Sequence, residues 1–477
     1  MTTTSAAATW AQPGPPAPRH TVTRRRPAAV PLWWRDASGV ALWALLVAVT
    51  CLWVLHGGVH DLGGLGDGLT SVGRLTGLLA SALLLVQVLL MARVPWFEQA
   101  WGQDELARTH RLVGFTSFNL MVGHIVLIVL GYAASSDLGL WGTTWDLVVN
   151  YPGMLLAVAG TSALVMVVVT SVRKARARLR YESWHLIHLY GYLGAGLALP
   201  HQLWTGRDFT ASSVSTWLWW TLYAVAAGAV LVFRVGVPVV RSLRAPLRVS
   251  EVRHDAADVT TVTVTGPGVE RLAAHGGQFF QWRFLDGPGW TRAHPYSLSA
   301  APDGRSLRFT AAHVGDGTRR LASLRPGTRV LVEGPYGRLH RGVRRRRKVL
   351  LMGSGIGITP MRALLEDLEH EPGDVTVIHR VRDTGSAVLA DEISAIADER
   401  GGRYLLVAGP RIPGRDTWLP VTAEHLTDAD ALRHLVPDVA EHDVFLCGSP
   451  GWMEAARAAA ISCGVPEERV HLERFSY

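Results

Sequence analysis

The chain of 477 residues is poor in cysteine. It contains only Cys51, Cys447 and Cys463, and no two of them form a CxxC pair. An iron–sulfur cluster held by four cysteines is therefore excluded, and nothing indicates a disulfide framework. Charged residues are also scarce, at 18%, whereas 48% of the residues are hydrophobic and the mean hydropathy is +0.18. A chain this apolar is not an ordinary soluble protein, and its composition indicates an integral membrane portion.

The charged residues are distributed unevenly along the chain. Apolar runs dominate residues 40–240, whereas charged residues, glycine and proline occur at globular density over 244–477. The net charge of +8 does not indicate nucleic-acid binding, because basic residues form short clusters, at 24–26 and 173–180, that flank apolar runs. We therefore predict a multidomain membrane protein with a membrane half in the lipid bilayer, a soluble half and no nucleic-acid partner.

Six apolar runs are long enough to cross a bilayer, which takes about 20 residues. They centre on residues 41–55, 77–91, 112–132, 154–172, 183–203 and 215–233. Basic residues fall in alternate connections, so the positive-inside rule places both termini in the cytoplasm of a multi-pass protein of the cell membrane. The first 36 residues are rich in Ala, Pro, Thr and Arg and are expected to form a disordered cytoplasmic tail, not a signal peptide.

Four histidines occur at two matching depths in the third and fifth predicted helices. His110 and His188 lie near the cytoplasmic ends, and His124 and His201 follow them by 14 and 13 residues, which is roughly 20 Å along a helix axis. Imidazoles are costly in hydrocarbon, and two facing imidazoles are what a six-coordinate haem iron needs. The pattern predicts two stacked b-type haems, one for the inner pair and one for the outer pair.

The step of 13 residues is a geometrical difficulty. On a regular helix it leaves His201 off the face that His188 occupies. Pro200 and the glycines before it could kink the helix, or add a bulge of one residue, and so rotate His201 back. His185 is an alternative ligand to His188, although we expect it on an adjacent face near the lipid headgroups. Arg74 in the second predicted helix, and Arg108 or Arg111 near the third, could neutralise haem propionates or could equally extend to the headgroups.

The segments THRLVGFTSFNLMVGHI (109–125) and WHLIHLYGYLGAGLALPHQ (184–202) resemble the transmembrane domain shared by ferric reductases and NADPH oxidases. This resemblance implies a pair of haems held by histidines on two helices. It also implies electron transfer across the membrane, with the electrons supplied by the soluble half.

The soluble half begins with alternating valine and threonine at 247–266, which is typical of antiparallel strands. The stretches that follow, including HPYS at 294–297 and GDGT at 315–318, resemble in their order the flavin β-barrel of the ferredoxin-NADP reductase superfamily. The first motif has histidine where arginine is usual, as in NADPH oxidases. The resemblance implies that the tyrosine packs on FAD, the serine hydrogen-bonds near flavin N5, and the histidine and the glycine-rich turn contact the phosphates. The FAD-binding residues implied are His294, Pro295, Tyr296, Ser297, Gly315, Gly317 and Thr318.

The run GSGIGITP at 353–360 lies between an apolar strand and a helix, where glycines admit a pyrophosphate to the helix N-terminus. The resemblance places Cys447 near the nicotinamide, with a buried structural cysteine as the alternative. Arg380 and Arg382 favour NADPH over NADH, because guanidinium groups suit a 2′-phosphate, but they could equally be solvated charges at a strand end. The predicted nucleotide-binding residues are Gly353, Gly355, Gly357, Thr359, Pro360, Arg380, Arg382, Cys447 and Gly448.

The chain ends in HLERFSY, and relatives of this kind stack a C-terminal aromatic ring on the flavin. Phe475 and Tyr477 both qualify, and Phe475 follows Glu473 at the spacing of the oxidase ending. The residues expected to take part in hydride transfer are therefore Cys447, Ser297 and Phe475.

We predict four parts: the tail (1–36), a six-helix transmembrane haem domain (37–242), an antiparallel β-barrel that binds FAD (243–345) and a Rossmann-like α/β domain that binds NAD(P) (346–477). The expected enzyme is an NAD(P)H-dependent flavin oxidoreductase. It passes electrons through FAD and two haems to ferric iron or oxygen outside the cell. The alternative is a membrane haem subunit that serves a periplasmic protein, or a haem-based redox sensor.

Overall fold

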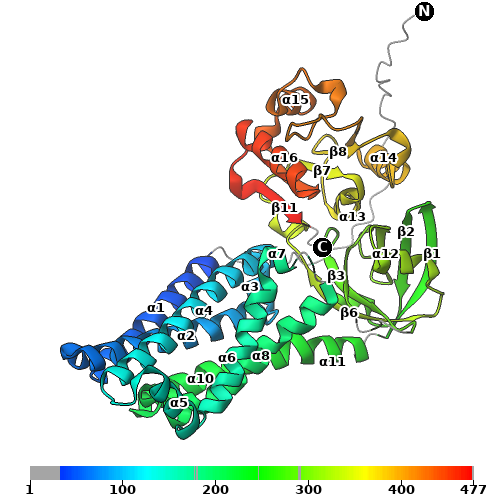
Figure 1. Ribbon diagram of the computed structural model, residues 1–477. Helices are drawn as coiled ribbons and strands as arrows, with labels where there is room; N and C mark the ends of the chain where they lie inside the picture. The colour runs from blue at the N-terminus through cyan, green and yellow to red at the C-terminus, as the bar shows by residue number, and fades with distance from the viewer. Residues whose placement is uncertain are drawn as a thin grey trace, which may run out of the picture. The chain divides into compact units, whose positions relative to one another are not determined.

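The computed structural model describes residues 33–474 except 177, 179, 180, 245, 288, 289 and 291 (Figure 1). The chain divides into a helical unit, Val30–Val237, and a unit from Pro238 onward that contains both β-sheets. Residues 1–32 of the predicted tail, and Phe475 and Tyr477, lie outside the described residues. Residues 33–36 form the start of the first helix, so the described helix begins before the predicted end of the tail.

Six long helices make up most of the helical unit: α1 (Trp33–Leu55), α2 (Leu65–Leu90), α4 (Gln103–Ala134), α6 (Met154–Ser171), α8 (Tyr181–Trp204) and α10 (Ser213–Ala229). They form from the apolar runs because a helix satisfies its own backbone hydrogen bonds, as hydrocarbon requires. A π-helical stretch, Val230–Gly236, continues α10 into α11 (Val237–Arg244). The short connecting helices are α3 (Pro95–Trp101), α5 (Gly139–Asn150), α7 (Arg173–Arg176) and α9 (Arg207–Thr210).

Among the described residues, five helices are long and apolar enough to cross a membrane. They are Trp33–Leu55, Leu65–Leu90, Glu105–Ala134, Met154–Ser171 and Ser213–Arg244. The helix α8 is 24 residues long, but its three histidines and its other polar side chains lower its hydropathy below that of the five. The count of six spans therefore stays a prediction.

The helices α2 and α4 pack against each other in antiparallel directions with a repeat of seven residues (Figure 1). Three side chains of α4 donate hydrogen bonds to backbone carbonyls of α2. The pairs are His124 with Gly73, Ser117 with Ala80 and His110 with Gln87, at 2.7, 2.8 and 3.0 Å. Successive partners are seven residues apart on both helices, so one face of each helix meets the other throughout. We call this set of three bonds the carbonyl ladder.

The helices α6 and α8 pack through glycines with the same repeat (Figure 1). A Cβ on Gly160 would lie 2.7 Å from the carbonyl oxygen of Gly194, and a Cβ on Gly153 would lie 2.8 Å from the backbone nitrogen of His201. Small residues allow helix backbones to approach closely in a membrane, where apolar burial gives no driving force. The helix α8 stays helical through Pro200, so no separate bulge precedes His201.

The second unit begins with an antiparallel sheet in the order β4-β3-β6-β1-β2-β5. Its strands are β1 (Leu247–Ala256), β2 (Val259–Thr265), β3 (Phe279–Phe284), β4 (His294–Ser297), β5 (Ser306–Ala312) and β6 (Arg329–Tyr336). Alternate residues of β3 are buried, as expected for a strand with one face on a core. An isolated bridge between Leu298 and Phe309 links the two ends of this strand order. The short helix α12 (Asp316–Arg320) follows β5.

The second sheet is parallel, in the order β11-β10-β7-β8-β9. Its strands are β7 (Val349–Ser354), β8 (Val375–Val381), β9 (Arg403–Ala408), β10 (Asp443–Gly448) and β11 (Val470–Arg474), and its helices are α13 (Ile358–Asp367), α14 (Ala390–Arg400), α15 (Asp428–Leu435) and α16 (Pro450–Ser462). The chain order reverses between β7 and β10. In open α/β sheets a ligand binds at the carboxyl ends of the strands beside such a reversal.

Replacement of Gly160 by alanine tests the contact between α6 and α8. The added methyl group would meet backbone at 2.7 Å, so we expect the free energy of unfolding to fall by about 1–3 kcal/mol. Gly191→Ala on α8 is the matched control, because no neighbouring atom lies within 4 Å of its Cβ position and alanine is the better helix former by up to ~1 kcal/mol. The midpoint of thermal unfolding in detergent should therefore fall for Gly160→Ala and rise for Gly191→Ala. A similar shift for both would contradict the close packing.

Candidate functional site

The helical unit contains two pairs of histidines, one residue of each pair on α4 and one on α8. The imidazole centroids of His110 and His188 lie 5.9 Å apart, with the rings inclined at 60°. His124 and His201 are neighbours across the same two helices. The structure therefore brings together the four residues that the spacing paired.

The carbonyl ladder fixes the chemical form of the two α4 histidines. A carbonyl oxygen can only accept a hydrogen bond, so the Nδ1 atoms of His110 and His124 carry the proton that they donate to α2. The Nε2 atom of each neutral ring is then left with a lone pair, which is the form that ligates a metal. Both rings therefore present the same nitrogen as a possible ligand.

The inner α8 histidine has a different partner. The Nδ1 atom of His188 lies 3.3 Å from the hydroxyl oxygen of Ser171 on α6, and the indole of Trp184 donates to the same hydroxyl at 3.3 Å. The Trp184 ring also lies 4.9 Å from the His188 ring, centroid to centroid. His188, and not the predicted alternative His185, makes the ring contact recorded with His110.

Arg74 of α2 is held by two carboxylates. Its Nε and Nη2 atoms each donate to Asp208 at 2.8 Å, and its Nη1 atom donates to Asp61 at 2.9 Å. The side chains of Arg74 and Asp208 are only 14% and 5% exposed. The charge of Arg74 is therefore compensated within the protein, and its role at a haem propionate or at the headgroups stays a prediction.

The sequence reasoning missed Arg234, which lies in the π-helical stretch after α10. Its Nη1 atom donates to the carbonyl oxygen of Met91 at 2.8 Å, at the end of α2 and one turn beyond Gln87, the partner of His110. Arg234 therefore lies near the inner pair of histidines. The available signal was an arginine within an apolar run, together with the tendency of π-helical turns to occur at functional sites.

In the antiparallel sheet, β4 carries the HPYS motif. The ring of Tyr296 stacks on Phe309 at 4.8 Å with an angle of 9°, and the His294 ring lies 6.0 Å from that of Tyr296. Tyr296 and Ser297 are buried, and the exposed Pro295 pairs with Gln281 in β3. The motif thus combines an inward-facing tyrosine and serine with a partly accessible histidine.

The glycine-rich turn that follows β5 lies against this motif. A Cβ on Gly317 would come within 2.4 Å of the His294 ring, so only glycine allows this approach. The backbone nitrogen of Gly315 donates to the Thr318 hydroxyl at 3.1 Å and is used within the turn. His294 and the GDGT turn, both predicted to contact phosphates, therefore lie next to each other. The backbone N–H of Gly315, one of the predicted donors, is already bonded within the turn.

At the reversal of the parallel sheet, the turn after β7 meets the end of β10. Gly353 pairs in register with Cys447, and a Cβ on Gly357 would lie 2.3 Å from the Cys447 carbonyl oxygen. Gly355 has a φ of +55°, which favours glycine, and no neighbouring atom lies within 4 Å of its Cβ position. A Cβ on Gly448 would come within 2.9 Å of Ser354. The predicted glycines are thus gathered around the buried Cys447.

The helix α13 begins directly after this turn. The Thr359 hydroxyl donates to the carbonyl oxygen of Ile356 at 3.0 Å, and Thr359 and Pro360 are both buried. Thr359 and Pro360 therefore support the shape of the turn from the protein interior and are not accessible to a ligand.

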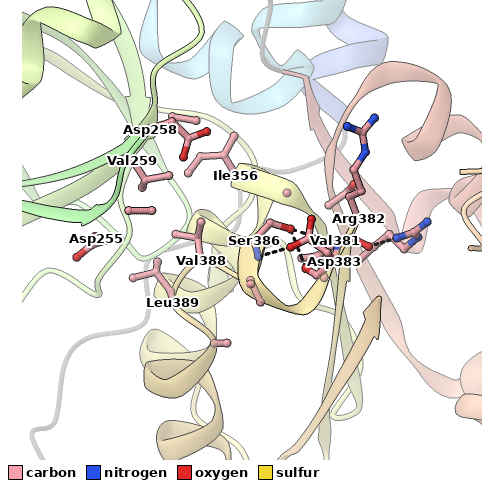
Figure 2. Close-up of a pocket in the computed structure, with 18 of the residues that line it drawn as sticks. Asp255, Asp258, Val259, Ile356, Val381, Arg382, Asp383, Ser386, Val388 and Leu389 are labelled. Atoms are coloured by element: carbon pink, nitrogen blue, oxygen red, sulfur yellow. Dashed lines mark hydrogen bonds between the residues drawn. The ribbon is translucent and has the colours of Figure 1, made fainter. Parts of the chain in front are cut away.

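A cavity of about 850 Å³ opens beside the turn, between residues of both sheets (Figure 2). Figure 2 shows Asp255, Asp258 and Val259 on one wall and Arg382 and Ser386 on another. Glu392 joins the two sheets beside the cavity. Its carboxylate accepts hydrogen bonds from Arg308 of β5 at 2.7 Å and from Arg253 of β1 at 3.1 Å, and it forms an ion pair with Nε of Arg362 of α13 at 3.0 Å.

The two arginines predicted to bind a 2′-phosphate differ in their surroundings. Arg380 is buried, and its guanidinium donates to the backbone carbonyls of Trp418, Val381 and Pro410. Burial lowers the pKa of Arg380. Arg382 is exposed on the cavity wall, and so is Arg411, which the sequence reasoning missed. Arg382 and Arg411 are therefore accessible to an anion in the cavity, whereas Arg380 instead holds strand ends together.

His379 is a second residue that the sequence reasoning missed. It is fully buried in β8, paired in register with Gly353 beneath the turn, and its Nδ1 atom lies 3.0 Å from the Tyr404 hydroxyl. Burial lowers the pKa of His379 to about 4. The ring is therefore neutral at physiological pH and supports the turn through packing and one hydrogen bond.

Comparisons with known families agree with this division of the chain. Residues 76–199 match the ferric reductase like transmembrane component, and residues 351–458 match the oxidoreductase NAD-binding domain. The first match contains three of the four histidines, since His201 lies just beyond it. The chain thus carries a ferric-reductase-like transmembrane component and an NAD-binding reductase domain, and the resemblance inferred from the sequence is confirmed.

Curated relatives match about half of the chain. The ferredoxin reductase component of 3-ketosteroid-9-alpha-monooxygenase from Mycolicibacterium smegmatis is 29% identical over 242 residues, which are 48% of this chain and 65% of that protein. An NADPH oxidoreductase from Mycobacterium tuberculosis is 26% identical over 238 residues, 48% of this chain and 59% of that protein. The match therefore spans less than two thirds of the length of either relative. Among solved structures, the cytochrome P450 reductase GcoB of Amycolatopsis is 25% identical with a TM-score of 0.40, covering 49% of this chain and 70% of that one.

Replacement of Asp208 by asparagine tests the polar cluster around Arg74. The variant leaves a largely buried guanidinium with one carboxylate fewer, so we expect the free energy of unfolding to fall by about 3 kcal/mol. Asp137→Asn removes an exposed carboxylate of the same unit and is the control, with an expected change below ~0.5 kcal/mol. Thermal unfolding in detergent measures both. Equal unfolding midpoints would show that the ion pair contributes nothing to stability.

Proposed function

We propose that this chain is a transmembrane oxidoreductase that transfers electrons from NAD(P)H in the cytoplasm to an acceptor outside the cell, by way of FAD and two b-type haems. One observation supports the proposal above all. Both α4 histidines donate Nδ1–H to backbone carbonyls, which leaves Nε2 available as a metal ligand, and the His110 ring lies beside His188, in a chain that also matches an oxidoreductase NAD-binding domain.

The inner histidine pair fits a haem iron by its dimensions and by its donor set. The observed separation between the ring centroids of His110 and His188 is 5.9 Å. Two imidazoles that face each other across a gap of this size would leave room for one metal ion between their nitrogens. Among the described residues no group of three or more His, Cys, Asp or Glu side chains could hold a metal ion. The remaining ligands would therefore come from a prosthetic group such as a porphyrin, and His124 and His201 would hold the second.

When bound, FAD accepts a hydride as a two-electron unit and the haems carry single electrons. The protein contributes binding and orientation. The α4 imidazoles are fixed in the ligating tautomer, and Gly317 allows the backbone close to His294. The glycines around Cys447 let the turn after β7 pack closely against the end of β10, and the space around Gly355 is open, at the carboxyl ends of strands where a nucleotide would bind. The hydride also brings one proton, which the flavin would release once both electrons have passed on, and we assign no side chain to that release.

The finer architecture follows from this proposal. We take α8 as the sixth span, since it holds two of the four ligands, and the bridge between Leu298 and Phe309 as the closure of the antiparallel sheet into a flavin barrel. Both termini and the reductase unit lie in the cytoplasm of a multi-pass membrane protein, as the basic connections favour. Ferric iron and oxygen are the two classes of electron acceptor that we propose for this chain.

A visible spectrum of the detergent-purified protein tests the proposal. We expect two low-spin b-type haems per chain, and both should become reduced when NADPH is added without oxygen. His110→Ala should remove the inner haem. A preparation that lacks haem, or whose haems stay oxidised although the nucleotide is consumed, would contradict the proposed route.

Variants of the cavity arginines test the nucleotide preference. Arg382→Ala and Arg411→Ala should each raise the KM for NADPH about tenfold, because a charge-assisted bond contributes about 1.5 kcal/mol or more and tenfold corresponds to 1.4 kcal/mol. The KM for NADH should change little. Arg433→Ala, on the exposed face of α15, is the control. Equal changes for both nucleotides would show that these arginines do not recognise the 2′-phosphate.

A further inference from the structure

Three helices meet at Gln202, the residue that follows the outer histidine ligand on α8. Its side-chain nitrogen donates to the hydroxyl of Ser81 on α2 at 3.2 Å, and its side-chain oxygen accepts from the hydroxyl of Tyr223 on α10 at 2.6 Å. Gln202 and Ser81 are buried, at 7% and 9% exposed. Both ends of the amide are therefore bonded, each to a different helix.

The outer histidine on α8 needs a support of its own. A step of 13 residues on a regular helix falls roughly 140° short of a whole number of turns, so contacts that orient His188 do not extend to His201. His188 has the Ser171 hydroxyl beside it, and both α4 histidines are bonded to α2 carbonyls. For His201 the contact with the start of α6 is made by the backbone, against Gly153. That contact involves the backbone of α8, so it does not by itself orient the His201 ring.

We propose that Gln202 is the positioning residue for the outer ligand: bonded to Ser81 and Tyr223, it sets the rotation of α8 at His201. The proposal rests on the proposed haem function. An amide bonded at both ends in a buried setting has one orientation, and a network with all its members satisfied specifies a single packing. Ser81 lies on α2 one turn after Gly77, and a Cβ on Gly77 would come within 2.5 Å of the His124 ring. One helix thus contacts the His124 side of the outer pair and holds the residue next to His201.

The test uses the full-length protein in detergent. Haem per chain is counted, and the midpoint potentials of the two haems are resolved by spectroelectrochemical titration. For Gln202→Leu we expect one of two results. Either one of the two haems is lost, or the midpoint potential of the outer haem alone shifts. For Tyr223→Phe, which removes a single hydroxyl, we expect two haems and a smaller shift of the same potential. The inner haem is the internal control in both variants.

Matched variants separate a local role from a general one. Tyr190→Phe removes an exposed hydroxyl from the same helix and should change neither potential. Ser171→Ala should shift the midpoint potential of the inner haem only, because the Ser171 hydroxyl lies beside His188. The proposal would be overturned if Gln202→Leu and Tyr223→Phe both kept two haems with unchanged midpoint potentials. It would also be overturned if the potentials of the inner and outer haems shifted equally. Wild-type protein without haem would refute the proposed function itself. The variants test the role of Gln202 only once the wild-type protein is found to bind two haems.

Discussion

The hydrogen bonds from α4 side chains to α2 backbone carbonyls are the constraint on which the rest of the helical unit depends. A carbonyl already bonded within its helix has a second lone pair, so it can accept a further bond without leaving its own helix. An imidazole N–H in hydrocarbon would otherwise be unsatisfied, at a cost of several kcal/mol. The carbonyls of Gly73 and Gln87 satisfy His124 and His110, and they determine at the same time the depth and the tautomer of both rings.

The same helix connects most of the other polar groups of the unit. Through Ser81 it reaches Gln202 on α8, through Arg74 it reaches Asp208 beyond α8, and at its end Met91 accepts from Arg234. These contacts explain why α2, which contributes none of the four histidines, determines where they lie. The reductase unit uses another device, in which glycines remove side chains from a turn so that backbone and ligand can approach.

Local patterns in the sequence predicted the parts of the structure that depend on neighbouring residues. The glycine-rich turn at 353–360 follows a strand and precedes a helix, and the histidine spacing defines depth along a helix regardless of what surrounds it. The roles of Arg74 and Arg380 could not be predicted, because each is decided by partners distant in the chain. Asp208 is 134 residues from Arg74, and Trp418 is 38 residues from Arg380. A charged residue in a motif is ambiguous until it is known whether the fold has already compensated its charge.

The same consideration separates the two arginines of the helical unit that lie near the histidine pairs. Arg74 is compensated by two carboxylates, so it adds little net charge near the outer pair. Arg234 is half-buried, and the bond recorded for its guanidinium in the described structure is to the neutral carbonyl of Met91. A cation within a membrane span needs an anion or water beside it. Under the proposed function, a haem held by His110 and His188 would bring acidic substituents that meet this requirement. We therefore expect Arg234, and not Arg74, to be the arginine that faces a bound haem.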